Sequence, residues 1–495
     1  MKAPPIRHRK QSRGRGDRAL AAIAVTVAVA SLPAIVRVVR TIPLRVSLDA
    51  NEGWNAYQAV AAFSGNLYPH PPALFFNNYP PLSFYLVFGV SRWIGDPIVA
   101  GRVIACIAFG ALAVLAGIAA RRMQCTAGEA AFAAVLFVAA TLSLSHYVGI
   151  DDPQFLGQAV ATAGLPLVLA EPRTRRRLWL TAALMSAGIF IKHNIVALPI
   201  ACVAWLWMHD RAAAIRLVAA GACFAIVGLT LCMWAFGAGF AEGLATPRGY
   251  AIAETARAFG RWIVRMPVFV AALVLLLRRF PHDRHVAFCA WYAFISSVTG
   301  LMLLGGDGVD WNVMFESNWA WCVTAAVALN RLTLSAPSAV VAFNRDRSRA
   351  GLAVAFTLLP LVAATLAVRR ASIEPSSSLA SRMARAPAFE DDIAFVASRG
   401  GPALCEELAL CFWAGKPAGV DLLNLAQQGR RAAPSIHELI RLIDQRRFGV
   451  VQIGLERSRL DPAAREVLRQ SYVIARMGPA GILFVPRDPA PLTYK

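Results

Sequence analysis

Long apolar stretches, separated by short polar loops, dominate the first 370 positions of this chain of 495 residues. A helix needs roughly 20 apolar residues to cross a lipid hydrocarbon core of about 30 Å. Eleven stretches approach that length with few charges inside them. We therefore predict transmembrane helices near residues 19–39, 99–120, 127–147, 154–170, 177–191, 195–208, 215–236, 264–279, 286–304, 318–332 and 351–369.

Basic residues next to these stretches set the expected orientation. The tail 1–18 is basic, and the apolar run after it is too long for a signal peptide and lacks a clear cleavage site, so it is expected to be an uncleaved anchor with a cytoplasmic N-terminus. Arginine-rich loops such as Arg121-Arg122 then lie in the cytoplasm, and most acidic loops face outward. An odd number of spans places residues 370–495 outside.

The first outward loop, residues 41–98, is the largest. It contains an apolar run from Leu82 to Ile94 that is too short to span a bilayer and follows the break at Tyr79-Pro80-Pro81. This run is expected to form an interfacial or re-entrant helix, because counting it as a full span would invert every later loop.

The last part of the chain has mixed polarity. Its pattern predicts helices at 406–414 and 435–447 and strands at 448–453 and 481–485. The expected fold is an α-helical polytopic membrane protein with about 11 transmembrane helices, a large first outward loop and a small C-terminal α/β extramembrane domain. The expected division is a basic cytoplasmic tail at 1–18, a membrane domain at 19–369 and an extracytoplasmic domain at 370–495.

Composition supports a membrane protein and excludes a soluble globular one, since 57% of the residues are hydrophobic and only 16% are charged. The formal net charge of +21 could suggest nucleic acid. Arginine and lysine concentrated beside membrane spans are better explained by the positive-inside rule and by contact with anionic membrane lipids. We expect no nucleic-acid partner, and a bacterial cytoplasmic (inner) membrane location.

The nine cysteines do not predict a disulfide framework, because most of them lie inside apolar stretches. Cys405 and Cys411 lie in a polar segment with a helical pattern. Six residues of separation on a helix would put their side chains on different faces and too far apart to bond.

Two acidic pairs are candidates for chemistry. Asp49 and Glu52 follow the first span, and a spacing of three puts both on one face of a helical turn. A partly desolvated carboxylate there could act as a general base, and capping of the following helix explains the pattern equally well. Asp151 and Asp152 precede Pro153; a helix cap explains much of this pair, although one of them could orient a nucleophile or bind a cation.

Basic residues in two places extend the list of candidates. Lys192 lies on the side that the positive-inside rule disfavours, so it should have a partner: a phosphate, or one of Asp49, Glu52 and Asp151. Arg257, Arg261 and Arg265 have the spacing of a helical stripe that could hold a lipid-linked phosphate, although snorkelling toward headgroups is the stronger explanation.

The loop at 305–318 lacks the ligand spacing of an EF-hand. Its Asp310, Asn312 and Glu316 could bond sugar hydroxyls, while Trp311 and Trp319 offer stacking faces. The sequence shows no glycine-rich phosphate loop, zinc pattern or Ser-His-Asp arrangement.

The order of these motifs carries a family resemblance. The motifs lie on the expected outward face and come in a fixed order along the chain: Asp49-x-x-Glu52, Tyr79-Pro80-Pro81-Leu82, Gly101-Arg102, Asp151-Asp152, Lys192 and the segment 312–316. In this order they resemble the bacterial membrane glycosyltransferases of the C-type fold. That group includes the dolichyl-phosphate-mannose protein mannosyltransferases and the aminoarabinose transferase of lipid A.

The resemblance implies a sugar donor linked through phosphate to a polyprenol, and an acceptor on a lipid, glycan or protein. It makes Asp49 the catalytic base, with Glu52 in support. The choice between Asp151 and Asp152 stays open, because Gly149-Ile150 stands where such enzymes commonly have an arginine. Some relatives use a divalent cation and others do not, so metal dependence is open. The implied site comprises catalytic Asp49, Glu52, Asp151 and Asp152, phosphate-binding Lys192, Arg257 and Arg261, and sugar- or acceptor-binding Tyr79, Asp310, Asn312 and Glu316.

A single displacement at the anomeric carbon, with inversion of configuration, is the expected mechanism. The main alternative is a flippase or transporter of a polyprenyl-linked sugar, which would also need a polar outward cavity. Transporters place ionisable residues near the bilayer midplane, whereas here these residues cluster in outward loops. A third alternative is a scaffold whose C-terminal domain binds partners.

Overall fold

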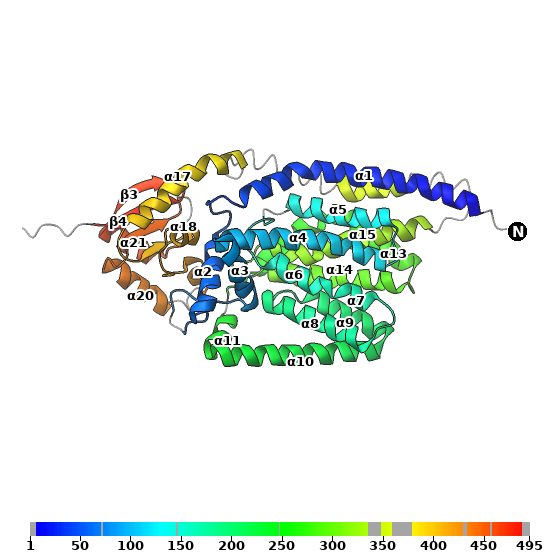
Figure 1. Cartoon of the computed structure of the whole chain (residues 1–495), viewed down its shortest axis with the longest axis horizontal. Coiled ribbons are helices and arrows are strands. Elements are labelled where there is room, and N and C mark those ends of the chain that lie inside the picture. Colours follow the sequence, from blue (N-terminus) through cyan, green and yellow to red (C-terminus); the bar gives the residue numbers. More distant parts are fainter. Residues whose placement is uncertain are drawn as a thin grey trace, which may run out of the picture.

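The predicted apolar stretches form long helices that pack side by side (Figure 1). The computed structural model describes residues 6–70, 73–144, 147–246, 248–334, 348–358, 379–428, 433–455 and 458–487. Ten of the eleven predicted stretches lie in helices or helix pairs. The eleventh, 351–369, is described only for its first part, where a helix runs from Ser348 to Leu358. The bundle contains α1 (Ile6–Thr41), α4 (Pro97–Arg122), α5 (Ala127–Leu144), α6 (Gln154–Ala163), α7 (Leu165–Leu169), α8 (Arg175–Ile191), α9 (Ala197–His209), α10 (Arg211–Phe236), α13 (Pro267–Arg279), α14 (Arg284–Leu303) and α15 (Phe315–Leu334).

Several of these helices are long and apolar enough to cross a membrane. In the part of the chain that the structure describes, four helices qualify: residues 18–41 of α1, and α4, α10 and α14. A fifth is obtained if α12 (Ile252–Ile263) and α13 are one span bent by 76°. The number of eleven spans therefore remains a prediction.

The outer helices expose apolar side chains that water would solvate poorly. Val25 and Val29 on α1, and Ile226 on α10, leave more than half of their side-chain surface exposed. A contiguous apolar exterior of this kind is what a lipid environment solvates. Inside the bundle, α6 and α8 approach closely at Gly157 and Gly188, where a Cβ atom added to Gly188 would lie 2.7 Å from the Gly157 carbonyl oxygen.

Four further helices lie in the segments that the sequence predicts as outward loops. The first loop contains α2 (Ala50–Ser64) and α3 (Leu82–Ile94), and α3 has the bounds of the predicted short apolar helix. Short α11 (Ala238–Leu244) and amphipathic α12 follow α10. A 3-10 turn, η1 (Trp311–Met314), leads into α15.

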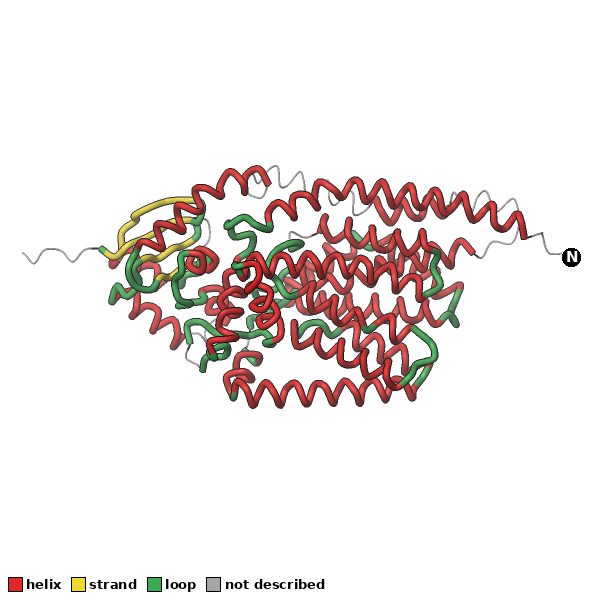
Figure 2. The backbone as a smooth tube through the Cα atoms, in the orientation of Figure 1, coloured by secondary structure: helices red, strands yellow, loops and turns green. Residues whose placement is uncertain are grey.

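The C-terminal unit contains a four-stranded sheet beside helices (Figure 2). The strand order is β1-β2-β4-β3, with β1 parallel to β2 and the other neighbours antiparallel. Two of these strands were predicted, whereas β1 and β3 were not. The elements are α17 (Leu379–Ser398), β1 (Ala403–Cys405), α18 (Leu408–Trp413), α19 (Leu422–Gln428), α20 (Ala433–Asp444), β2 (Val450–Ile453), α21 (Pro462–Ser471), β3 (Tyr472–Gly478) and β4 (Gly481–Pro486).

The prediction that Cys405 and Cys411 cannot bond is wrong, because they form a disulfide. The two residues do not share a helix. Cys405 ends strand β1, the chain turns at Glu406 and Glu407, and Cys411 lies in the short helix α18. This turn brings the two Cα atoms to 5.9 Å, within the range that a disulfide spans.

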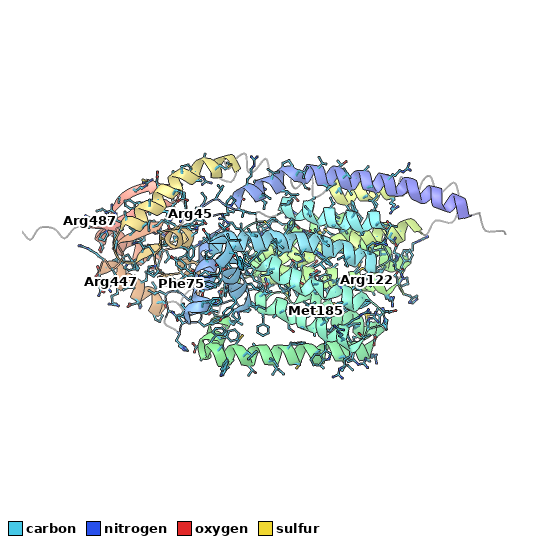
Figure 3. All side chains as sticks on the ribbon, in the orientation of Figure 1. Arg45, Phe75, Arg122, Met185, Arg447 and Arg487 are labelled. Atoms are coloured by element: carbon cyan, nitrogen blue, oxygen red, sulfur yellow. A yellow bond between two sulfur atoms is a disulfide. The ribbon has the colours of Figure 1, made fainter. Side chains whose placement is uncertain are left out.

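The C-terminal unit packs against α2 through α18 at one end of the bundle, and the N-terminal end of α1 lies at the other (Figure 1). Three polar contacts join the two parts. Arg45 lies 3.2 Å from Glu390, and the Tyr57 hydroxyl donates to the Lys416 carbonyl at 2.8 Å. The Trp413 indole donates to the Asp96 carboxylate at 2.9 Å. Figure 3 shows Arg45 beside this junction and Arg122 at the far end of the bundle. The motifs of the predicted outward loops and the C-terminal unit therefore meet at one end of the molecule.

Candidate active site

A cavity of about 360 Å³ lies where the bundle loops meet the C-terminal unit. The loops contribute apolar, aromatic and polar side chains, and the C-terminal unit contributes a polar wall. Among the lining residues are Asn51, Trp54, Tyr79, Tyr147, Lys192, His193, Arg248, Asp310 and Asn312 from the loops, and Glu406, Asn424, Gln427 and Arg459 from the C-terminal unit. Tyr79, Lys192, Asp310 and Asn312 were predicted from the sequence, and the structure brings them to one cavity.

Asp49 is the N-cap of α2 and is not itself among the residues that line the cavity. Its Oδ1 accepts a hydrogen bond from the Asn51 amide at 2.9 Å, so the capping explanation is correct for one oxygen of this carboxylate. The residues that follow it, Ala50 and Asn51, line the cavity. The cap thus fixes a half-buried carboxylate at the entrance to α2, beside the cavity wall.

Glu52 has a different environment from Asp49. It is fully buried, and its carboxylate lies 2.6 Å from Nη2 and 2.7 Å from Nε of Arg102 on α4. The same carboxylate accepts the amides of Leu48 and Asp151 at 2.8 and 3.1 Å. Glu52 therefore ties the segment between α1 and α4 to the loop between α5 and α6, and it supports the turn that carries Asp49.

The two adjacent aspartates have different surroundings. Asp151 is buried, and packs so tightly on α4 that a Cβ atom at Gly101 would lie 1.9 Å from its Oδ1. Burial, followed by the nearby Glu52 and Asp152 carboxylates, raises the pKa of Asp151 well above its usual range. Asp151 is not among the residues that line the cavity.

Asp152 faces the lysine. Its Oδ1 caps α6 by accepting the Gln154 amide at 2.8 Å, and its Oδ2 lies 3.3 Å from Lys192 Nζ. The sequence pointed to Asp49, Glu52 or Asp151 as protein partners of Lys192, and this was wrong, because the turn before α6 directs Asp152 toward the end of α8.

Lys192 is held in a buried position at the end of α8. Its amide donates to the Gly188 carbonyl at 2.9 Å, and its ammonium lies 3.9 Å from the centre of the Tyr79 ring. Burial alone would lower the pKa of Lys192, but the Asp152 carboxylate and the Tyr79 hydroxyl raise it. The lysine is therefore a fixed cation in the cavity wall.

Tyr147 is a site residue that the sequence did not indicate. It is buried and lines the cavity, and burial followed by the charges of Asp49, Asp310 and Asp152 raises the pKa of its hydroxyl. These acidic groups, from three separate loops, therefore converge on one phenol. A single tyrosine in a short loop carries no sequence signal for this.

The loop before α15 brings only part of its predicted set to the cavity. Asp310 and Asn312 line it, and Asp310 also accepts the Trp311 amide at 2.6 Å. Glu316 is buried elsewhere, where its Oε1 accepts the Leu198 amide at the start of α9 at 3.1 Å. Glu316 therefore caps a neighbouring helix in this structure.

The arginine stripe lies outside the cavity. Arg257 pairs with Glu254 at 2.8 Å and is exposed, and Arg261 and Arg265 lie over Trp311 at 5.2 and 5.5 Å. Helix α12 ends at Ile263, so the predicted helical spacing does not reach Arg265.

Other basic residues take the place of this stripe at the cavity. Arg248 from the loop before α12 and Arg459 from the loop before α21 both line it. His193 also does so, and burial together with the Lys192 and Arg248 cations lowers its pKa to about 4. At neutral pH the imidazole is therefore uncharged, and the positive charge on this wall comes from lysine and arginine.

The C-terminal unit is bonded to the bundle loops around the cavity. The Asn78 side-chain amide donates to Asn424 at 3.0 Å, and the Gly249 amide donates to the Gln427 carbonyl at 3.3 Å. Glu406 accepts the Gly454 amide at 2.8 Å. The bonds of Asn424 and Gln427 could not be assigned from the sequence, because they join segments that lie more than 100 positions apart, whereas the Glu406 bond stays within the C-terminal unit.

The described residues contain no group of three His, Cys, Asp or Glu side chains arranged to hold a metal ion.

Comparison with known proteins places the fold. No family model matches the chain, and no curated protein matches it in sequence. Among solved structures, two structures of ArnT from Cupriavidus metallidurans are similar to this chain, one bound to undecaprenyl phosphate and one in the apo state. Each has a TM-score of 0.61 and 16% sequence identity, and the match covers 93% of this chain and 97% of the ArnT chain. The oligosaccharyltransferase AglB from Archaeoglobus fulgidus has a lower TM-score of 0.47 at 13% identity, over 95% of this chain and 75% of that chain. The expected C-type fold of membrane glycosyltransferases is thus confirmed.

Proposed function

We propose that this protein is a glycosyltransferase that moves a sugar from a polyprenyl-phosphate donor to an acceptor hydroxyl on a lipid, glycan or protein. The observation that carries the proposal is the cavity itself, in which a fixed lysine, the polar side chains of Asp310 and Asn312, and the residues that follow Asp49 meet. The fold shared with an ArnT bound to undecaprenyl phosphate supports this choice of donor.

The proposed step is an in-line displacement. Asp49 takes the proton of the acceptor hydroxyl, the acceptor oxygen bonds to the anomeric carbon, and the bond from that carbon to the phosphate oxygen breaks. The polyprenyl phosphate leaves with its negative charge stabilised by Lys192, with Arg248 and Arg459 on the same cavity. One displacement inverts the anomeric configuration, and Asp310 and Asn312 are placed to bond sugar hydroxyls.

The cavity is proposed to open outside the cytoplasm of a bacterial inner membrane. The basic N-terminal end of α1 lies at the end of the bundle opposite the C-terminal unit, which supports residues 1–18 inside, 19–369 as the membrane domain and 370–495 outside (Figure 1). A cavity at one end of the bundle, rather than at its middle, supports transfer over transport.

The test is sugar transfer from radiolabelled polyprenyl-phosphate donors to membrane acceptors by purified protein in lipid vesicles. Wild type should transfer with inverted configuration, and Asp49→Asn should lower kcat by at least about 100-fold, because a positioned base contributes that much. Equal transfer by both would remove Asp49 as the base. Movement of donor across the vesicle membrane without transfer would indicate a flippase.

A further inference from the structure

The disulfide found in the C-terminal unit closes a short loop that lies against the Asp49 loop. Cys405 and Cys411 are its ends, and Glu407 lies between them. The Ser47 hydroxyl is 2.7 Å from Glu407 Oε1 and 3.1 Å from the Asp49 backbone carbonyl. A single hydroxyl therefore links the C-terminal unit to the residue that caps α2.

The disulfide-closed loop also touches α2 directly. A Cβ atom at Gly53 would lie 2.0 Å from the Ala409 nitrogen and 2.3 Å from the Leu408 carbonyl carbon, so the two backbones are in contact. Ala56 and Ala409 are completely buried at the same contact. Because Asp49 caps α2, a shift of the closed loop would shift the end of the helix that carries Asp49.

A hydrogen bond to the sheet holds the backbone of Glu407 in place. Its amide donates to the Gln452 side chain on β2 at 2.8 Å. The neighbouring Glu406 lines the cavity, whereas the Glu407 side chain contacts Ser47. This geometry suits a residue that acts on Asp49 without touching substrate.

We propose that Glu407 is a positioning residue that fixes the Asp49 loop through Ser47, and that the Cys405–Cys411 disulfide holds Glu407 in place. The proposal rests on the proposed function, because it gives Asp49 the role of base. It assigns the C-terminal unit a task in catalysis that is separate from lining the cavity.

The charge state of Glu407 gives this role a measurable signature. Burial raises the pKa of Glu407 to about 7; the Ser47 hydrogen bond and Arg459 oppose this rise, and the Asp49 and Glu52 charges add to it. When Glu407 is protonated, it can donate to Ser47, which then donates to the Asp49 carbonyl. When Glu407 is ionised, it accepts the Ser47 hydrogen bond, so that bond is no longer donated to the Asp49 carbonyl, and the Glu407 charge repels the Asp49 carboxylate. The contact at Asp49 is then weaker.

The first test compares the kinetics of transfer by Glu407→Ala and Glu407→Gln. Wild-type kcat should fall as pH rises through about 7. Glutamine, which can donate to Ser47 as the protonated acid does, should keep a high kcat above that pH. Alanine should lower kcat by about tenfold or more at every pH with KM nearly unchanged, since small misplacement of a base is costly.

Glu438→Ala is the matched control, because Glu438 is a surface carboxylate of the same unit that pairs only locally with Arg441. It should leave kcat and the pH profile as in wild type. A wild-type profile in Glu407→Ala would overturn the proposal, and so would a glutamine variant as slow as the alanine one.

The second test does not depend on activity. Amide hydrogen exchange at residues 47–53 should be faster in Glu407→Ala and in the double variant Cys405→Ser/Cys411→Ser than in wild type, because both release the loop. Unchanged exchange would overturn the proposal. Faster exchange in a protein whose wild type transfers no sugar would overturn the proposed function alone and support the link between the two loops.

Discussion

At the scale of single residues, the segment between α1 and α4 is organised around one buried ion pair. The Arg102 guanidinium binds Glu52 and also donates to the backbone carbonyls of Leu44 and Val46, at 2.6 and 2.8 Å. One arginine thus satisfies the acid and the polar backbone around it. Such pairs cost desolvation energy, so their value lies in fixing the position of the loop.

Removing one partner of this pair should be far worse than removing both. Arg102→Met leaves the Glu52 charge buried and unpaired, and should lower the free energy of unfolding by about 3–5 kcal/mol. The double variant Glu52→Gln/Arg102→Met should recover part of this loss. Denaturant unfolding in detergent micelles measures both, and equal losses in the single and double variants would show that the ion pair itself is unimportant.

Lys192 provides a second prediction at this scale. Lys192→Met removes a charge-assisted contact to the proposed donor phosphate, so kcat/KM should fall about 10- to 100-fold, as expected for loss of a hydrogen bond to a charged group. Arg257→Ala is the control, because Arg257 is exposed and lies outside the cavity. If Arg257→Ala lowers kcat/KM more than Lys192→Met does, the arginine stripe and not Lys192 binds the phosphate.

At the scale of elements, the position of Lys192 relative to Asp152 depends on how α8 packs on α6. Gly188 has no room for a side chain, because an added Cβ atom would lie 2.7 Å from the Gly157 carbonyl oxygen and 2.8 Å from the Ala161 Cβ. Lys192 follows one turn later, and α6 begins just after Asp152. The glycine contact therefore sets the distance between the two charges.

Gly188→Val should separate α6 from α8 and lower stability by about 1–3 kcal/mol, the usual cost of overpacking. Gly221→Val in α10 is the matched control, because nothing lies within 4 Å of a Cβ atom added there. Thermal unfolding in detergent compares the two. If Gly221→Val is as harmful as Gly188→Val, the cause is helix propensity and not the α6–α8 contact.

At the scale of the whole molecule, the C-terminal unit and the bundle are joined by a polar contact that depends on pH. The Asp421 amide donates to the Leu74 carbonyl at 2.7 Å, and its carboxyl accepts the Asn424 amide at 3.0 Å while Asn424 binds Asn78. Burial raises the pKa of Asp421 to about 6, and its hydrogen bonds with Asn424 act against this rise.

A raised pKa means that the folded protein holds the Asp421 proton more tightly than the unfolded chain. The stabilising contribution is therefore complete below about pH 4 and is lost as pH rises through about 6, by up to about 3 kcal/mol. Asp421→Asn should remove this part of the pH dependence. The difference in unfolding free energy between wild type and the variant, measured from pH 4 to 7, checks it, and a difference that does not change with pH would contradict it.

The sequence by itself determined the helical bundle, the short helix α3 and the α/β character of the C-terminal unit. These follow from local patterns, since the length of an apolar run and its flanking charges act on neighbouring residues. It also indicated Tyr79, Lys192, Asp310 and Asn312, because polar residues beside apolar spans stand out in the pattern.

Only the tertiary structure decided which of the acidic and basic residues share a cavity. Asp152, and not Asp151, faces Lys192; Glu316 and Arg257 lie elsewhere; and Tyr147, Arg248 and Arg459 join the site from loops without a motif. The Cys405–Cys411 disulfide and the contact of Glu407 with Ser47 depend in the same way on a turn and on docking. Such contacts join positions up to about 360 residues apart, and the direction of a side chain across that separation is set by packing, which no local pattern encodes.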